Sequence, residues 1–215
     1  MRAVPRISVY GGKMSKRVKA TVTVARLAAE AALYFVLTFF MQPIAFSPVL
    51  QFRVGEALTL LPIIFPEAVF GVTLGCLLAN LFSPYAWYDI VFGTLATLIA
   101  AALTYLIGRW MKNKRLIWRA LAGSLPPIFV NAVILPLMWL LAMGDAAYWL
   151  NFGMLIVTQA GAVICIGVPL VLALDKTNSA IRSRLERAEG KTSDPAEKTE
   201  KNRDEERLRE KRDKD

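Results

Sequence analysis

The chain has 215 residues, of which 55% are hydrophobic, and its apolar residues form long unbroken runs instead of the one-sided stripes of a soluble helical domain. It contains two cysteines and no histidine, which excludes a mixed Cys/His zinc site and removes the commonest general base. The net charge of +9 gathers at the ends of the apolar runs, which is typical of a membrane protein and not of a nucleic-acid-binding protein.

These features predict an all-α integral membrane protein that has the lipid bilayer as a partner and binds no nucleic acid. Cys76 and Cys165 each lie inside an apolar run, so we expect both to be buried small hydrophobic residues. We expect no catalytic residues, no metal and no cofactor. The phosphate loop G-x-x-x-x-G-K-[ST] does not occur, so the chain shows no means of hydrolysing ATP.

The first predicted helix, residues 21–41, follows a polar segment. Residues 1–19 carry six Lys/Arg and indicate a cytoplasmic lead-in, not a cleaved signal peptide. Arg26 and Glu30, four residues apart, can pair locally. The alanines of this helix form two overlapping small-xxx-small patterns that permit another helix to approach closely, Ala25 with Ala29 and Ala28 with Ala32. The approaching helix belongs either to a partner protein or to the same bundle.

Arg53 and Glu56 lie three residues apart in the apolar stretch QFRVGEALTLLPIIFPE, residues 51–67. Residues at this spacing share a helix face, and ionisable groups in a bilayer are costly enough that a functional partner is the default hypothesis. The alternative is that the two charges pair with each other or reach the lipid headgroups and bind nothing. Residues 53–65 make about 20 Å of helix against a hydrocarbon core of about 30 Å, which predicts a short, tilted or broken second helix.

Four further helices are predicted along the chain, over residues 66–82, 90–108, 117–143 and 149–174. The third helix carries a Gly71/Gly75 face, and the sixth carries the close-packing pair Gly161 and Gly167. The loop SPYAWYD before the fourth helix is rich in aromatic residues, which suits either an interfacial belt or a binding role. From Asp175 the composition changes to alternating charge, which predicts a disordered or loosely helical tail.

Six spans place the N-terminus, the basic loop 109–119 and the C-terminal tail on the cytoplasmic side, in agreement with the positive-inside rule. Five spans would export that loop. The predicted organisation is therefore a basic segment (1–19), a six-helix membrane domain (20–175) and a charged cytoplasmic tail (176–215), in a multi-pass cell-membrane protein with both termini inside. Residues 1–175 hold 13 Lys/Arg, and twelve of them then face the cytoplasm. The exception is Arg53.

Polar residues from several segments converge on the outer half of this arrangement. The candidate substrate-binding residues are Gln51, Arg53, Glu56, Asn80, Trp87, Tyr88, Asp89, Asn131, Asn151 and Gln159. Carboxylates, amides, one guanidinium and aromatic rings suit a flat ligand with hydrogen-bonding groups on its edge. A nucleobase-like or vitamin-like molecule fits this set better than a sugar or a bare ion, and the chemistry alone does not reach a particular compound.

The stretch from Gln51 to Arg109 resembles the queuosine-precursor transporter family (QueT). The specific motifs are R-x-x-E-A-L-T at 53–59, GCLLAN at 75–80 and DIVFGTLATL at 89–98. Weaker similarity continues through LPPIFVNAVI and YWLNF to VPLVLAL, so the resemblance covers about residues 20–175. The long charged tail departs from the family pattern.

This resemblance implies a substrate-binding S component of an energy-coupling-factor (ECF) transporter, a kind of ABC transporter, that captures a deazaguanine precursor of queuosine from outside. It implies two kinds of partner, a transmembrane coupling subunit that meets the alanine patterns and a pair of ATPase subunits. It places Arg53, Glu56, Asn80 and Asp89 near the ligand. Two other functions stay open: a stand-alone secondary carrier with Glu56 or Asp89 as coupling group, and a membrane scaffold whose polar residues only join helices.

Overall fold

The computed structural model describes residues 16–46, 51–85 and 87–192, and the regular elements within these ranges are all helical. They are α1 (Lys16–Phe40), α2 (Gln42–Ala45), η1 (Val54–Ile63), α3 (Ala68–Asn80), η2 (Asp89–Gly93), α4 (Thr94–Trp110), α5 (Leu116–Gly123), α6 (Leu125–Met143), α7 (Tyr148–Ala160), η3 (Gly161–Gly167) and α8 (Val168–Thr192). The predicted all-α class is confirmed.

Helical segments lie at all six predicted positions. Four stretches are long and apolar enough to cross a membrane: Ala20–Phe40, Asp89–Trp110, Leu116–Met143 and Tyr148–Ile181. The other two, η1 and α3, have 10 and 13 residues. Each of these extends about 20 Å, less than the hydrocarbon core of about 30 Å. Six complete crossings therefore stay a prediction.

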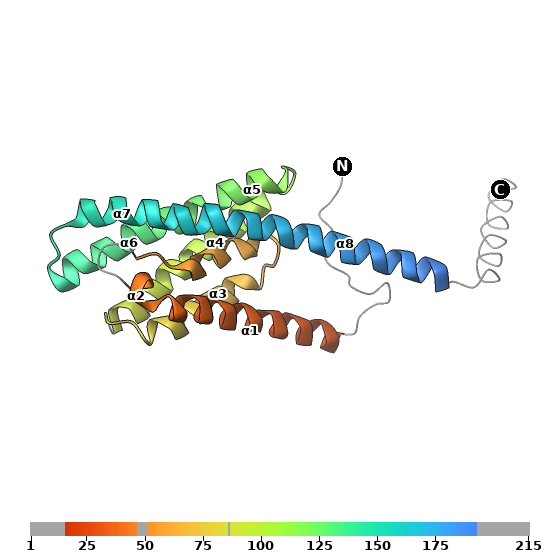
Figure 1. Ribbon diagram of the computed structural model, residues 1–215, viewed down its shortest axis with the longest axis horizontal. Coiled ribbons are helices and arrows are strands. Elements are labelled where there is room, and N and C mark those ends of the chain that lie inside the picture. The colour runs from red at the N-terminus through yellow and green to blue at the C-terminus, as the bar shows by residue number, and fades with distance from the viewer. Residues whose placement is uncertain (1–15, 47–50, 86, 193–215) are drawn as a thin grey trace, which may run out of the picture. The chain divides into compact units, whose positions relative to one another are not determined.

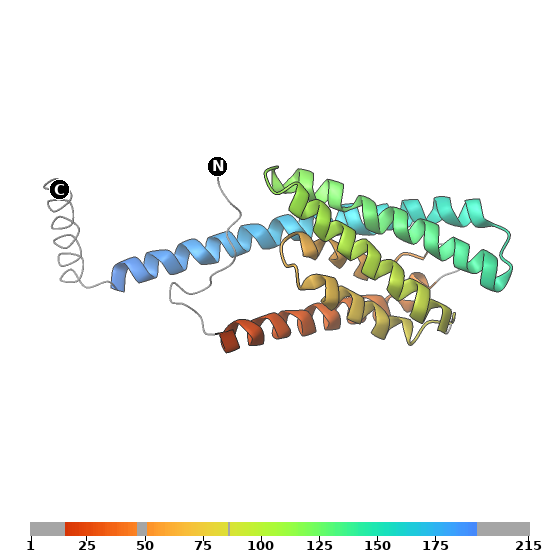
Figure 2. The same ribbon diagram turned by 180° about the vertical axis from the view of Figure 1, so that it is seen from behind.

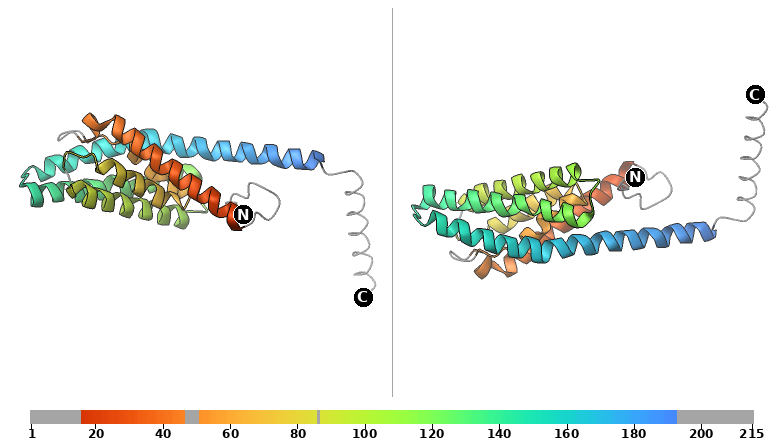
Figure 3. Two further views of the ribbon diagram at one scale, coloured as in Figure 1. Left: turned by 90° about the horizontal axis from the view of Figure 1, so that it is seen from below. Right: turned by 90° about the horizontal axis from the view of Figure 1, so that it is seen from above.

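The chain divides into two compact units, Met1–Leu174 and Asp175–Asp215. In the first unit the long helices run lengthwise beside one another (Figure 1 and Figure 2). α3 packs between α1 and α4, and α6 packs between α4 and α7, as the views from below and above also indicate (Figure 3). In the second unit the described residues, 175–192, form the end of α8. Of the predicted lead-in (1–19) and the predicted tail (176–215), residues 1–15 and 193–215 lie outside the described residues.

The short helix η1 is the innermost element of the first unit. It contacts α1, α3, α4, α5 and η3, and nine of its ten residues are buried. Its backbone is a 3₁₀ helix with Pro62 inside it, and the Thr59 hydroxyl donates to the Glu56 carbonyl at 2.6 Å. Runs of 3₁₀ helix this long are uncommon and frequently mark functional sites. The prediction of a short, irregular second helix is confirmed.

Glycines bring neighbouring helices close to one another, as their spacing predicts. A Cβ atom on Gly75 of α3 would lie 2.6 Å from the Ala31 carbonyl of α1, so no side chain fits there. Gly71 faces α1 in the same way, against Glu30 and the Leu27 carbonyl. A Cβ atom on Gly167 of η3 would lie 2.7 Å from the Ala57 carbonyl of η1.

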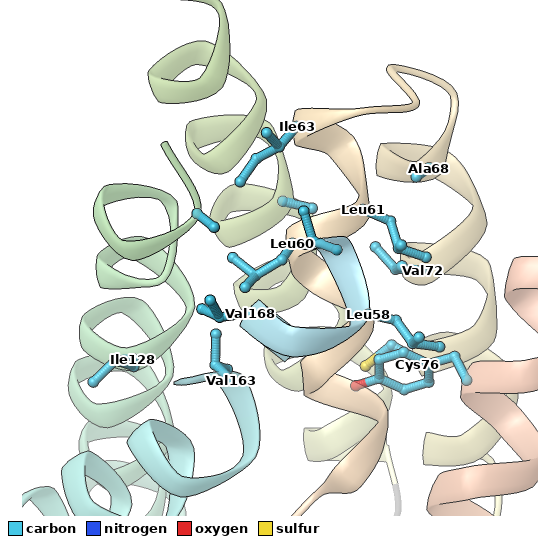
Figure 4. Packing of buried hydrophobic residues seen from close by; sticks show 14 of the residues in the cluster. Leu58, Leu60, Leu61, Ile63, Ala68, Val72, Cys76, Ile128, Val163 and Val168 are labelled. Carbon is cyan, nitrogen blue, oxygen red and sulfur yellow. The ribbon is translucent and has the colours of Figure 1, made fainter. Parts of the chain in front are cut away.

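The apolar core surrounds the second half of η1. Leu58, Leu60, Leu61 and Ile63 pack against residues of α3, α6, η3 and α8 (Figure 4). The first half of η1 is different, because it carries Glu56 and follows directly on Arg53. The apolar cluster thus lies beside the second half of η1, whereas Arg53 and Glu56 lie at its beginning.

Two predictions are wrong. Arg26 does not pair with Glu30; it forms an ion pair with Glu67 at 3.3 Å and lies over the Phe65 ring, because the turn before α3 comes next to α1. Cys165 is exposed, although Cys76 is buried as predicted. An apolar run does not tell which of its residues face inward, since a membrane helix is apolar on all sides.

Candidate functional site

Arg53 occupies the N-cap position of η1 and is almost fully buried, at 2% exposure. Its NH2 group donates to Asp89 Oδ2 at 3.1 Å and to Gln51 Oε1 at 3.4 Å. Its Nε atom donates to the Ala45 carbonyl at 3.3 Å, and the guanidinium lies 4.8 Å from the centre of the Phe46 ring. A buried arginine needs such a set of partners, because desolvation of an unpaired charge costs several kcal/mol.

Gln51 contacts Arg53 and has a strained backbone conformation. Its φ angle is +41°, in the left-handed region that non-glycine residues seldom adopt. The side chain is nevertheless 1% exposed and holds the Arg53 guanidinium. Strain of this kind costs about 1–3 kcal/mol and is concentrated at functional sites.

Asp89 is the first residue of η2, a π-helical turn at the start of α4. Its Oδ2 atom accepts from Arg53 and, at 2.6 Å, from the Ser83 hydroxyl. The Asn80 amide at the end of α3 donates to the Asp89 carbonyl at 2.8 Å and so joins the two helices. π-helical turns frequently occur at functional sites, where the extra residue redirects a side chain.

Glu56 lies one turn further along η1 and is 1% exposed. Its Oε1 atom accepts from the Tyr34 hydroxyl at 2.6 Å and from the Thr97 hydroxyl at 3.2 Å. The alternative that Glu56 pairs with Arg53 is not observed, since within the described residues Arg53 forms its ion pair with Asp89. A chain of contacts from Thr97 through Cys76 to Asn80 still links the two charged residues.

We use the name polar cluster for Gln51, Arg53, Glu56, Asn80 and Asp89 with their partners Tyr34, Ser83 and Thr97. The structure brings Gln51, Arg53, Asn80 and Asp89 into direct contact and links Glu56 to them through Thr97 and Cys76; their role in binding a substrate stays a prediction. Sequence reasoning missed the three partners and also Trp139, whose ring lies 6.1 Å from that of Tyr85. A hydroxyl inside an apolar helix, as at Tyr34 or Thr97, is the signal that could have found the partners.

Several buried polar atoms at this end of the bundle have no hydrogen-bond partner among the described residues. The acceptors are Glu56 Oε2, Asp89 Oδ1 and Gln159 Oε1, and the donors are Gln51 Nε2, Asn131 Nδ2, Trp139 Nε1 and Gln159 Nε2. Native proteins leave few such atoms, and each costs about 1–3 kcal/mol. The set offers both donors and acceptors, so it suits a ligand whose edge carries both.

Asn131 and Gln159 extend the polar cluster toward α6 and α7. The Asn131 carboxamide of α6 interacts with the Glu56 carboxylate, although its Nδ2 atom does not reach hydrogen-bonding geometry. Gln159 of α7 is 1% exposed, and two residues later Gly161 packs against the Phe52 ring. Gly161, two residues beyond Gln159, thus lies next to the segment that leads into η1.

Three of the candidate residues lie apart from these contacts. Trp87 is 57% exposed and stacks on Tyr88 at 4.4 Å between ring centres, while Tyr88 packs against the apolar side chains of α6 and α7. Asn151 of α7 donates to Oδ2 of Asp145, in the loop that precedes α7, at 2.7 Å. The arrangement of Trp87 is that of an interfacial aromatic residue.

The four alanines of the small-xxx-small patterns, Ala25, Ala28, Ala29 and Ala32, are all exposed. The alternative that they pack inside the bundle is not observed, because α1 turns Ala31, Tyr34 and Thr38 inward instead. The exposed side of α1 also carries Val24 and Leu33. α1 thus presents a flat apolar face of small side chains on the outside of the bundle.

Comparison of the sequence with known proteins identifies the family of this chain. The sequence model of the QueT transporter family matches residues 24–176, which is more than half of the chain. One relative, the queuosine precursor transporter QueT of Lactococcus lactis subsp. cremoris (strain MG1363), is 34% identical over 89 residues, or 40% of this chain and 52% of the relative. The match thus spans about half the length of that relative, and no solved structure matches. The motifs behind the sequence resemblance contain residues of the polar cluster. The chain belongs to the QueT transporter family, which bears out the expectation of a transporter and not an enzyme.

Proposed function

We propose that the chain is the substrate-binding S component of an ECF-type ABC transporter and that it imports a queuosine precursor of the deazaguanine type. The observation that carries this proposal is the set of buried donors and acceptors that have no hydrogen-bond partner among the described residues. A deazaguanine is flat and carries N–H donors and a carbonyl acceptor on its edge, so it can supply the missing partners.

The proposed topology has six spans with both termini in the cytoplasm. Basic residues support it, since Arg109 lies in the last turn of α4, and Lys112, Lys114 and Arg115 lie between α4 and α5, away from Asp89 at the other end of this helix. In this orientation the polar cluster lies in the outer half of the membrane. η1 begins there, directly after Arg53. It is too short for a full crossing and packs against the surrounding helices.

We further propose that the exposed alanines of α1 dock onto the transmembrane coupling subunit, which in turn recruits two ATPase subunits. Small side chains allow the backbones of two membrane helices to approach closely. The absence of a phosphate loop from the sequence agrees with a subunit that relies on others for ATP hydrolysis.

Titration of the purified protein tests the substrate. We expect 7-deazaguanine-type precursors to bind, and riboflavin, thiamine and biotin to give no heat in calorimetry. Binding of one of the vitamins in place of the precursors would overturn the proposed substrate. Uptake by cells that contain this chain but lack ECF coupling and ATPase subunits would favour a stand-alone carrier with Glu56 or Asp89 as the coupling group.

Docking is tested separately from ligand binding. Ala28→Leu with Ala32→Leu fills the flat face of α1, so the coupling subunit should no longer co-purify while precursor affinity stays unchanged. Val157→Leu is the matched control, because Val157 is 69% exposed on α7 and lies outside this face. Normal co-purification of the double variant would contradict the role of the alanines.

A further inference from the structure

The polar cluster contains three ionisable residues that are almost inaccessible to water. Arg53, Glu56 and Asp89 are 2%, 1% and 0% exposed. The Arg53 guanidinium and the Asp89 carboxylate meet at 3.1 Å, so these two charges balance each other. Glu56 forms no ion pair within the described part of the chain. One positive charge thus stands against two negative charges, and Glu56 is the residue without a counter-ion.

Neutral hydroxyl groups hold the Glu56 carboxylate without cancelling its charge. Oε1 accepts from Tyr34 at 2.6 Å and from Thr97 at 3.2 Å, and these two residues come from α1 and α4. Oε2 is buried and has no hydrogen-bond partner among the described residues. Donated hydrogen bonds favour a carboxylate in its charged form, whereas burial opposes that form. This carboxylate therefore needs a positive charge beside it, from a cation or from a proton.

The helices around the polar cluster contain no second cation for Glu56. Residues 31–66, 68–108 and 120–174 have four charged side chains in all: Arg53, Glu56, Asp89 and Asp145. Arg53 is the basic member of this set, and Asp89 already neutralises it. The other buried arginine, Arg119, donates to the Ile63 carbonyl at the last residue of η1, away from Glu56 in its first turn. A cation that pairs with Glu56 has to come from the ligand.

We infer that the imported deazaguanine is a cation whose ammonium group donates to Glu56 Oε2 and so supplies the missing counter-ion. This inference rests on the proposed function, and it separates amine-substituted deazaguanines from uncharged ones. The hydrogen bond it describes joins two opposite charges in a buried site, where such bonds are stronger than those between neutral groups. The excess of carboxylates over basic groups in these segments also attracts a cation during its approach.

Two ligands of nearly equal size test the charge of the substrate. 7-Aminomethyl-7-deazaguanine carries an ammonium group, and 7-hydroxymethyl-7-deazaguanine carries a hydroxyl group at the same place on the same ring. A hydrogen bond between charged groups in place of a neutral one typically gives a preference of about tenfold to a hundredfold. We expect the wild-type protein to bind the aminomethyl compound more tightly by that factor in calorimetric titrations.

Glu56→Gln should abolish this preference. The amide oxygen can still accept from Tyr34 and Thr97, and the size of the side chain is kept, but the negative charge is lost. Affinity for the aminomethyl compound should fall about tenfold to a hundredfold, whereas affinity for the hydroxymethyl compound should change little.

Asp145→Asn is the matched control. Asp145 lies in the loop before α7, where its carboxylate accepts from the Ala147 N–H and from the Asn151 amide. The substitution removes a negative charge from the same set of segments, outside the polar cluster, and should leave the wild-type preference in place. If Asp145→Asn reduced the preference as much as Glu56→Gln, the general negative potential and not pairing with Glu56 would be the cause, and the inference would be wrong.

The remaining outcomes separate the inference from the proposed function. Equal affinities of the wild type for the two ligands, or tighter binding of the hydroxymethyl compound, would overturn the inference and leave the proposed function in place. A Glu56→Gln protein that keeps the wild-type preference would do the same. A wild type that binds no 7-deazaguanine, charged or uncharged, would overturn both. If Glu56→Gln does not fold, the wild-type preference alone decides.

Discussion

The ion pair between Arg53 and Asp89 provides a stringent test of how the bundle tolerates charge. Arg53 and Asp89 side chains are 2% and 0% exposed, and they meet at 3.1 Å. Asp89→Asn keeps the shape of the side chain and removes its negative charge. The Arg53 guanidinium then stays buried without a counter-ion, which typically lowers the free energy of unfolding by about 3–5 kcal/mol.

The chain also contains a matched ion pair near the surface. Arg26 and Glu67 meet at 3.3 Å, with side chains that are 32% and 17% exposed. Water screens this pair, so Glu67→Gln should cost only about 0–1 kcal/mol. Both substitutions change a carboxylate into an amide within an ion pair, and they differ mainly in burial.

Thermal unfolding in detergent, followed by circular dichroism, measures both effects. A loss of 1 kcal/mol lowers the melting temperature of a protein of this size by about 2–4 °C. We expect a decrease of roughly 6–20 °C for Asp89→Asn and of less than about 4 °C for Glu67→Gln. The double variant Arg53→Met/Asp89→Asn should recover part of the loss, because the guanidinium charge that lost its counter-ion is then removed as well. Equal small decreases for the two single variants would refute the argument that the Arg53 charge depends on Asp89.

Further predictions concern packing and binding. Gly75→Ala should destabilise the protein by about 1–3 kcal/mol, because the new Cβ atom would lie 2.6 Å from the Ala31 carbonyl. Gly153→Ala is the control: no neighbouring atom lies within 4 Å of the new Cβ atom, so this change should be neutral or stabilise α7 by up to about 1 kcal/mol. Chemical denaturation measures both free energies of unfolding. Tyr34→Phe removes the 2.6 Å hydrogen bond to Glu56 Oε1, which should cost about 1–2 kcal/mol and weaken precursor binding about tenfold in calorimetry, and unchanged affinity would separate Tyr34 from the binding site.

The positions of the main helical segments could be predicted from the sequence. Long apolar runs, prolines and charged loops are local properties, and they locate η1 and α3 between longer helices. The glycine faces at Gly75 and Gly167 were also readable, because only a residue without a side chain permits backbones to approach that closely. The polar residues of the cluster were recognisable because charged and amide groups are rare in such segments.

The pairing of those residues was decided by the tertiary structure. Spacing along the chain suggests Arg53 with Glu56 and Arg26 with Glu30, but the actual partners are Asp89 and Glu67, which are distant in sequence. A charge pairs with whichever counter-charge the packing of helices brings within about 4 Å, and this depends on helix rotation and on the 3₁₀ geometry of η1. The exposure of Trp87, Cys165 and the α1 alanines has the same origin, because an apolar helix carries no local mark of the face that turns inward.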